Sequence, residues 1–140
     1  MNNPIVIDSS VFLSAFWSKD VFTEASETFF RRIPTDALVI LPSLVIAEVL
    51  VNVAKQNPLG IKEALAYLSH FRVVDLTLPF LHAIIGGMIN VQALKTSDFI
   101  IAATAKLHQA TLITWDKRLL AADGLLCPIM KPSDYIASVS

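Results

Sequence analysis

Four acidic residues stand where a carboxylate is costly unless it binds a cation: Asp8, Glu48, Asp98 and Asp116. Asp8 directly follows a run of β-branched residues, and almost all the sequence neighbours of Glu48 are aliphatic. An unpaired buried carboxylate costs several kcal/mol or takes up a proton. A divalent cation removes this cost because it supplies positive charge and accepts oxygen ligands. These positions therefore predict a metal site.

The donor set favours Mg²⁺ or Mn²⁺ over zinc. Hard cations prefer carboxylate and water oxygens, whereas zinc in proteins is usually bound by histidine and cysteine. The single cysteine, Cys127, gives neither a disulfide framework nor a cysteine metal site. The histidines are scattered along the chain, and we interpret them as ordinary surface or half-buried side chains: His70, His82 and His108.

Alternating apolar and helical patterns predict the elements that position these acids. Strand-like apolar runs occupy residues 4–7, 37–41, 72–76 and 110–114, and a short fifth run follows at 126–130. Helical patterns occupy residues 11–17, 21–32, 43–56, 59–69, 77–91, 98–108 and 116–122. Asp20 is expected to cap the second of these helices, and Thr96 or Ser97 the sixth. Continuous apolar strands between helices indicate a parallel sheet covered on both faces. We therefore predict one three-layer α/β/α domain over residues 1–140, with a central parallel sheet of four to five strands.

The acids fall where such a sheet would bind a ligand. Open parallel sheets bind ligands outside the carboxyl ends of their strands. Asp8 ends the first strand, and Asp116 lies two residues past the fourth. Asp98 lies in the first turn of the helix that precedes the fourth strand. The three can converge only if the first and fourth strands lie close together in the sheet.

Each acid also has a purely structural explanation. Asp98 and Asp116 could each stabilise a helix N-terminus through the helix dipole. Asp8 could be a turn residue, and Glu48 could pair with a basic residue distant in sequence. It is much less plausible that all four acids are structural than that any one of them is.

Composition limits the class of protein. Of the 140 residues, 54% are hydrophobic and only 16% charged, which excludes intrinsic disorder for most of the chain. The surplus of apolar residues predicts a partner chain or self-association. We find no convincing transmembrane helix or signal peptide, so we expect a cytoplasmic protein. The net charge is −1, but setting the four acids aside leaves eight acidic residues against eleven basic ones. That balance is compatible with a phosphate-backbone partner.

Four motifs in order resemble those of PIN-domain nucleases, and the similarity covers nearly the whole chain. The matching segments are Ile5–Ser10, Pro42–Val49, Thr96–Ala105 and Thr114–Leu119, each of which contains one of the four acids. Among PIN domains, the sequence most resembles the VapC-type toxins of toxin–antitoxin pairs. One departure is Phe99, because the family usually has a small residue directly after the third acid. Phe99 could pack beneath the site or narrow the approach to it.

The resemblance implies a metal-dependent endoribonuclease that leaves a 5′ phosphate and a 3′ hydroxyl. It also implies a homodimer that is held inactive by a small antitoxin protein. Mg²⁺ or Mn²⁺ would bind Asp8, Asp98 and Asp116, directly or through water. Glu48 would bind a second ion or orient a water molecule.

Further residues are assigned supporting roles. Ser10 and Thr114 match hydroxyl positions of the family motifs, and we expect them to hydrogen-bond a carboxylate or a metal-bound water. Each could equally be an ordinary turn or cap hydroxyl. Lys117 and Arg118 follow the fourth acid and could contact phosphate, although such residues more often form a solvated helix face. Three aromatic residues could stack on a base, although packing in the core is the simpler interpretation: Trp17, Tyr67 and Trp115.

Other functions remain as alternatives. A phosphatase would have a second aspartate where Ser10 stands, and a phosphorelay receiver would have paired acids at its first strand. The stronger alternatives keep the PIN-like fold. They are a solitary RNA-processing PIN nuclease, with no antitoxin partner, and a catalytically silent PIN-like binding domain.

Overall fold

A computed structural model describes residues 3–90 and 94–140 of the chain. The described residues contain one sheet of five strands, all parallel, in the order β3-β2-β1-β4-β5. The strands are β1 (Ile5–Ile7), β2 (Val39–Pro42), β3 (Arg72–Val74), β4 (Thr111–Ile113) and β5 (Ile129–Met130). The predicted α/β fold with a central parallel sheet is therefore confirmed, including the short fifth strand.

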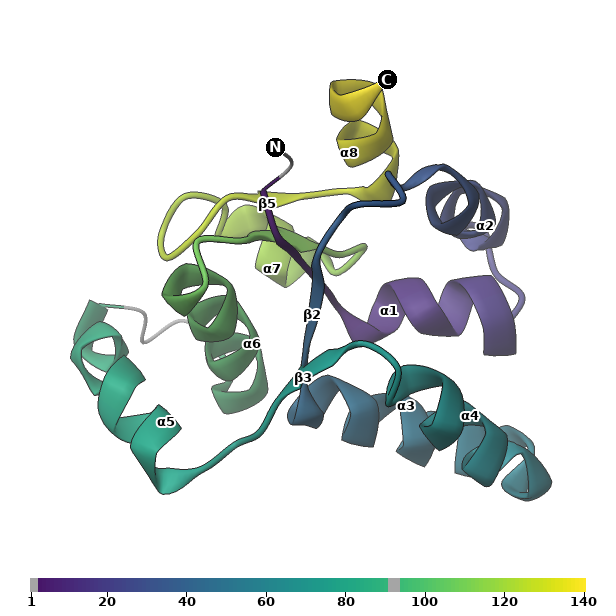
Figure 1. Cartoon of the computed structure of the whole chain (residues 1–140), viewed down its shortest axis with the longest axis horizontal. Helices are drawn as coiled ribbons and strands as arrows, with labels where there is room; N and C mark the ends of the chain where they lie inside the picture. The colour runs from purple at the N-terminus through teal and green to yellow at the C-terminus, as the bar shows by residue number, and fades with distance from the viewer. Residues whose placement is uncertain (1–2, 91–93) are drawn as a thin grey trace.

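Helices cover both faces of this sheet. They are α1 (Ser9–Phe12), η1 (Leu13–Trp17), α2 (Thr23–Arg32), α3 (Ser43–Gln56), η2 (Pro58–Gly60), α4 (Ile61–Leu68), α5 (Leu78–Ile84), η3 (Ile85–Asn90), α6 (Thr96–Leu107), α7 (Lys117–Ala121) and α8 (Pro132–Val139). Figure 1 shows α1 to α4 on one side of the strands and α5, α6 and α7 on the other. The sheet is thus the middle of three layers.

The order of the strands places β1 beside β4, as the convergence of the acids requires. The chain runs from β1 outward through β2 to β3, then crosses back to β4 on the other side of β1 and continues to β5. The direction of winding therefore reverses between β1 and β4. Such a reversal opens a crevice at the carboxyl ends of the two strands, where ligands of parallel sheets bind.

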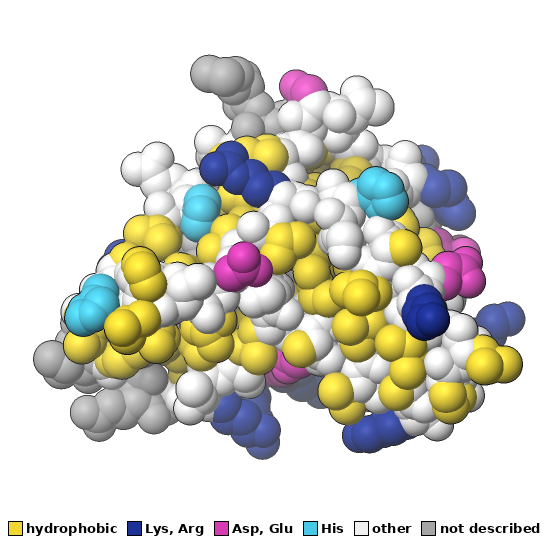
Figure 2. Space-filling model, turned by 60° about the horizontal axis from the view of Figure 1, so that its bottom comes forward, with side chains coloured by type: hydrophobic (Ala, Val, Ile, Leu, Met, Phe, Trp, Pro, Cys, Tyr) yellow, Lys and Arg dark blue, Asp and Glu magenta, His cyan; other side chains and the backbone are white. Residues whose placement is uncertain are grey.

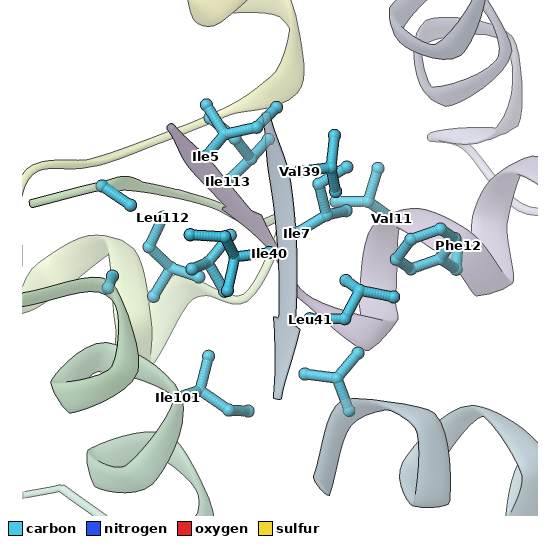
Figure 3. Packing of buried hydrophobic residues seen from close by; sticks show 14 of the residues in the cluster. Ile5, Ile7, Val11, Phe12, Val39, Ile40, Leu41, Ile101, Leu112 and Ile113 are labelled. Atoms are coloured by element: carbon cyan, nitrogen blue, oxygen red, sulfur yellow. The ribbon is translucent and has the colours of Figure 1, made fainter. Parts of the chain in front are cut away.

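The core lies on both faces of the central strands. Every residue of β1 is fully buried, and Leu112 and Ile113 of β4 are fully buried beside it. Figure 3 shows labelled side chains of these strands, with Phe12 of α1 on one side of them and Ile101 of α6 on the other. A strand covered on both faces needs apolar residues throughout, which explains why these runs do not alternate with polar ones.

Four helix predictions need correction. The helix expected at 11–17 begins at Ser9 and continues as the π-helix η1. The helix expected at 21–32 begins at Thr23, because Asp20 lies in the preceding turn and accepts a hydrogen bond from the amide of Phe22 (2.8 Å). The helix expected at 77–91 is α5 followed by the 3-10 helix η3, and its predicted last residue lies outside the described residues.

The fourth correction concerns the start of α6. Lys95 occupies the N-cap position, with no side-chain hydrogen bond to the helix start, so neither Thr96 nor Ser97 is the cap. A further helix, α8, was not predicted at all. Its Tyr135 ring packs edge-on against Phe29 of α2, with ring centroids 5.9 Å apart. This contact brings the C-terminal segment into the core.

Candidate metal centre

The carboxyl ends of β1 and β4 are joined by hydrogen bonds that run through Asp8. The Asp8 amide continues the β1–β4 pairing by donating to the Ile113 carbonyl (2.9 Å). Its side chain is 5% exposed, and the Oδ2 atom accepts from two hydroxyls. Thr114 Oγ1 donates at 2.8 Å and Ser10 Oγ at 2.9 Å. These bonds fix the orientation of the Asp8 carboxylate.

The same two hydroxyls also hold the segment that carries Asp116. Thr114 Oγ1 accepts from the Asp116 amide (2.9 Å), and Ser10 Oγ accepts from the Trp115 amide (3.1 Å). Each hydroxyl therefore donates to Asp8 and accepts from the chain after β4. Ser10 and Thr114 thus do more than cap a turn, because they couple the positions of Asp8 and Asp116.

Asp116 has a structural role, but that role uses only one of its oxygens. It is the N-cap of α7, and its Oδ1 accepts from the Arg118 amide (2.8 Å). The structural explanation considered from the sequence placed Asp116 at a helix N-terminus, but through the helix dipole and not through a capping hydrogen bond. The side chain is half-buried. Lys117 and Arg118 are exposed at the start of α7.

Asp98 lies in the first turn of α6 and is half-buried. Burial raises its pKa, and the negative charges of Asp116 and then Asp8 raise it further. Lys95 and Arg118 act in the opposite direction and lower it. Lys95 therefore belongs to the electrostatic environment of these acids. Sequence reasoning missed it, although it stands only three residues before Asp98.

Glu48 has a buried carboxylate oxygen, Oε1, without a hydrogen-bond partner in the described part of the chain. The Asn52 side-chain amide donates to the Glu48 backbone carbonyl (2.9 Å). The pKa of Glu48 is raised to about 7, first by burial and then by the charges of the other three acids: Asp8, Asp98 and Asp116.

The aliphatic sequence neighbours of Glu48 predict a helix that is apolar and buried on every side, and this prediction is wrong. Helix α3 is not buried all round, because Ala47 is exposed and Val51 is 55% exposed. Val45, Val49 and Val53 form the buried face. Glu48 lies at the margin of that face, half-buried, with one oxygen enclosed. The cost of its charge therefore comes from that enclosed oxygen and from the neighbouring acids.

The charges of the four acids thus influence one another near the carboxyl ends of β1 and β4. The charges of Asp8, Asp98 and Asp116 all raise the pKa of Glu48, and burial raises the pKa of Asp8 despite its hydrogen bonds. Within residues 3–90 and 94–140, however, no three His, Cys, Asp or Glu side chains lie in an arrangement that would hold a metal ion as they stand. The orphaned oxygen and the all-carboxylate donor set fit a hard divalent cation.

Phe99 packs in the core and does not project into solvent. It is 7% exposed and belongs to a second apolar cluster that also contains Phe80 and Ile84. A Cβ atom at Gly87 would lie 3.7 Å from the Phe99 ring and 3.5 Å from Leu126. Both distances are ordinary van der Waals contacts, so Phe99 packs beside η3 without requiring glycine at position 87.

The comparisons with known proteins define the class. The PIN domain family model matches residues 5–125, so this chain belongs to the PIN domain family. A comparison with curated proteins finds no match. In the described part of the chain, no helix is long and apolar enough to cross a membrane.

Solved structures give the particular fold within that class. A toxin–antitoxin complex from Klebsiella pneumoniae matches with a TM-score of 0.71 and 20% identity, covering 91% of this chain and 97% of that one. VapC20 from Mycobacterium tuberculosis, described as a sarcin–ricin loop cleaving toxin, matches at 0.70 and 14%, covering 84% and 94%. VapBC2 from Rickettsia felis, bound to a promoter DNA fragment, matches at 0.70 and 14%, covering 91% and 97%. The chain therefore has the fold of the PIN domains found in VapC-type toxins.

Proposed function

We propose that this protein is a divalent-metal-dependent endoribonuclease. The observation that carries the proposal is the buried, unpartnered oxygen of Glu48, with a pKa raised to about 7 beside three further acids. A nearby cation would satisfy that oxygen and neutralise the mutual repulsion of the carboxylates. Membership of the PIN domain family supports the same conclusion.

The proposed ligands of Mg²⁺ or Mn²⁺ are Asp8, Asp98 and Asp116, directly or through water, with Glu48 on a second ion or on a water molecule. Such ions supply charge neutralisation at the phosphate and lower the pKa of water. The hydroxyls of Ser10 and Thr114 hold Asp8 in one orientation through their hydrogen bonds.

Basic residues at the margin of the site provide the proposed contacts to RNA. Lys117 and Arg118 are exposed directly after Asp116, and Lys95 is exposed three residues before Asp98. Their charges would attract the phosphate backbone toward a site that is otherwise acidic. Lys95 and Arg118 are close enough to lower the pKa of Asp98, so they lie within electrostatic reach of the carboxylates.

Cleavage of total RNA by the purified protein tests this function. We expect cleavage with Mg²⁺ or Mn²⁺, none with excess chelator, and recovery when metal is added back. The products should carry 5′ phosphates, which 5′-end mapping would detect. Metal-independent cleavage would contradict the proposal. Intact RNA under all metal conditions would favour a silent binding domain.

We further propose that the protein is the toxin of a toxin–antitoxin pair and forms a homodimer. Solved proteins with this fold include toxin–antitoxin complexes, some of them bound to DNA. Large apolar side chains are exposed on α4, α5 and η3, among them Leu65, Leu78 and Ile85. Figure 2 shows wide hydrophobic areas over the lower face of the molecule. Such areas support an interface with a second chain.

Expression in a bacterial host tests the toxin role. Growth arrest by the wild-type chain, relieved by co-expression of a small protein encoded beside it, is the expected result. Growth that continues normally, with no such neighbouring gene, would favour a solitary RNA-processing nuclease. Light scattering of the purified chain would test the dimer.

A further inference from the structure

An aromatic pair lies directly beside the four acids. Trp115 stands between Thr114 and Asp116. Its backbone amide donates to Ser10 Oγ, so it belongs to the hydrogen-bond network that joins the ends of β1 and β4. Its indole Nε1 donates to the hydroxyl of Ser26, a fully buried residue of α2, at 2.8 Å. Trp115 is therefore held at both its backbone and its ring.

The ring of Phe22 lies parallel to that fixed indole. Their centroids are 4.5 Å apart and their planes differ by 14°. The other ring pairs recorded in the described residues are tilted or edge-on, at interplanar angles of 37° or more. Phe22 and Trp115 thus form a short stack, in contrast to the edge-on packing of the aromatic core.

The outer ring of this stack is accessible to solvent. Phe22 is 37% exposed, although Trp115 covers one of its faces. Its backbone is held as well, because its amide donates to Asp20 Oδ1 (2.8 Å) and its carbonyl accepts from the Ser26 amide (2.9 Å). A flat group that reached the ring face opposite Trp115 would extend the stack by one member.

A nucleobase is the flat group that the surroundings favour. Unpaired RNA bases are recognised by stacking on aromatic side chains, and every base offers a π-face. The stack is joined through Trp115 to Asp116, and the exposed cations Lys117 and Arg118 follow at once. A strand whose phosphate contacted those cations would bring a neighbouring base toward the ring.

We propose that Phe22, supported by Trp115, is a stacking platform for one unpaired base of the RNA substrate beside the cleavage site. This proposal rests on the proposed function for its choice of ligand. The platform would contact the flat face of a base and not its edge. We therefore expect the protein to bind single-stranded RNA with little preference among the four bases.

The test compares Phe22→Leu, which keeps apolar bulk and removes the ring, with Phe22→Tyr, which keeps the ring. Binding of a labelled single-stranded RNA oligonucleotide is measured by fluorescence anisotropy with excess chelator, so that nothing is cleaved. We expect Phe22→Leu to weaken binding about fivefold or more, and Phe22→Tyr to restore it. Phe16→Leu is the matched control, because Phe16 is also exposed (46%) but contacts the rings of Trp17, Phe30 and Tyr67.

A second measurement reports stacking itself. When 2-aminopurine is placed at successive positions of the oligonucleotide, its emission should fall at one position with the wild type and with Phe22→Tyr, and not with Phe22→Leu. In cleavage assays, Phe22→Leu should raise KM and leave kcat nearly unchanged.

Each outcome bears on one proposal. Equal RNA affinity of Phe22→Leu and the wild type, with no quenched position, would overturn the platform even if metal-dependent cleavage is found. Ring-dependent binding without any cleavage would support the platform and overturn the nuclease. Melting curves of the three variants show whether a weaker affinity merely reflects loss of fold.

Discussion

Strand β1 and Asp8, the residue that follows it, are adjacent in sequence but affect the stability of the fold in opposite ways. Ile5, Val6 and Ile7 are fully buried, and burying each such side chain contributes about 1.5–3 kcal/mol. Asp8 is nearly as buried, yet burial of its carboxylate disfavours the charged form and raises its pKa. The hydroxyls of Ser10 and Thr114 offset only part of that cost. The comparison shows where this fold gains stability and where it accepts a cost that only a ligand would remove.

Substitution of Asp8 should have the largest effect of all, and it should change the cleavage activity more than the stability. Asp8→Asn removes the negative charge and keeps an oxygen that can accept from both hydroxyls. We expect the rate of RNA cleavage to fall about a thousandfold or more. The melting temperature without metal should stay the same or rise, because a buried charge is removed.

Glu27→Gln, at an exposed position of α2, is the control for loss of one negative charge. It should change neither the cleavage rate nor the melting temperature appreciably. Cleavage by Asp8→Asn at the wild-type rate would remove Asp8 from the site.

Substitution inside the strand should have the reverse pattern. Ile7→Ala leaves a cavity in the middle of the core, which costs about 2–5 kcal/mol of the free energy of unfolding. Urea denaturation would measure the loss, and Ile7→Val should cost only about 0.5–1.5 kcal/mol. The folded fraction of Ile7→Ala should still cleave RNA. A fully folded Ile7→Ala variant without cleavage activity would contradict the distinction between the strand and Asp8.

The hydroxyls that join the two regions should have intermediate effects. Thr114→Val removes the donor to Asp8 and the acceptor for the Asp116 amide. We expect metal affinity or cleavage rate to fall about 10–100-fold. Thr104→Val is the matched control, since Thr104 is also fully buried but donates to the Ile100 carbonyl within α6 (2.7 Å). Equal activities of the two variants would show that the Thr114 hydroxyl is only structural.

The smallest effect concerns pH. Glu48 has a pKa raised from its ordinary 4.5 to about 7, so the folded state binds its proton more tightly than the unfolded state does. Its contribution to the stability of the metal-free protein is therefore complete below about 4.5 and is lost as pH rises through about 7. Glu48→Gln should flatten this part of the profile, measured by thermal melts in chelator. If the melting temperature of the wild type depended on pH no more than that of Glu48→Gln between about 4.5 and 7, the burial of this carboxylate would be contradicted.

The sequence predicted the fold better than it predicted the side-chain environment. Apolar runs at β1, β2 and β4 are unambiguous because a strand covered on both faces excludes polar residues. The adjacency of β1 and β4 could only be stated as a requirement, since strand order depends on pairings between segments distant in sequence.

The features that were missed are those with weak local signals. Helix α8 is short, and its only start signals are Pro132 as its first residue and Asp134 in its first turn. The stacking of Phe22 on Trp115 joins residues 93 positions apart, and no sequence pattern predicts it. The orphaned oxygen of Glu48 depends on the exact packing of α3.

Calorimetric titration of the metal-free protein with Mn²⁺ at pH 7.5 tests the central claim most directly. We predict saturable binding by the wild type that is lost or strongly weakened in both Asp8→Asn and Glu48→Gln, residues 40 positions apart on different elements. The absence of any binding by the folded wild type, or equal binding by all three proteins, would contradict the claim that these carboxylates form one cation site.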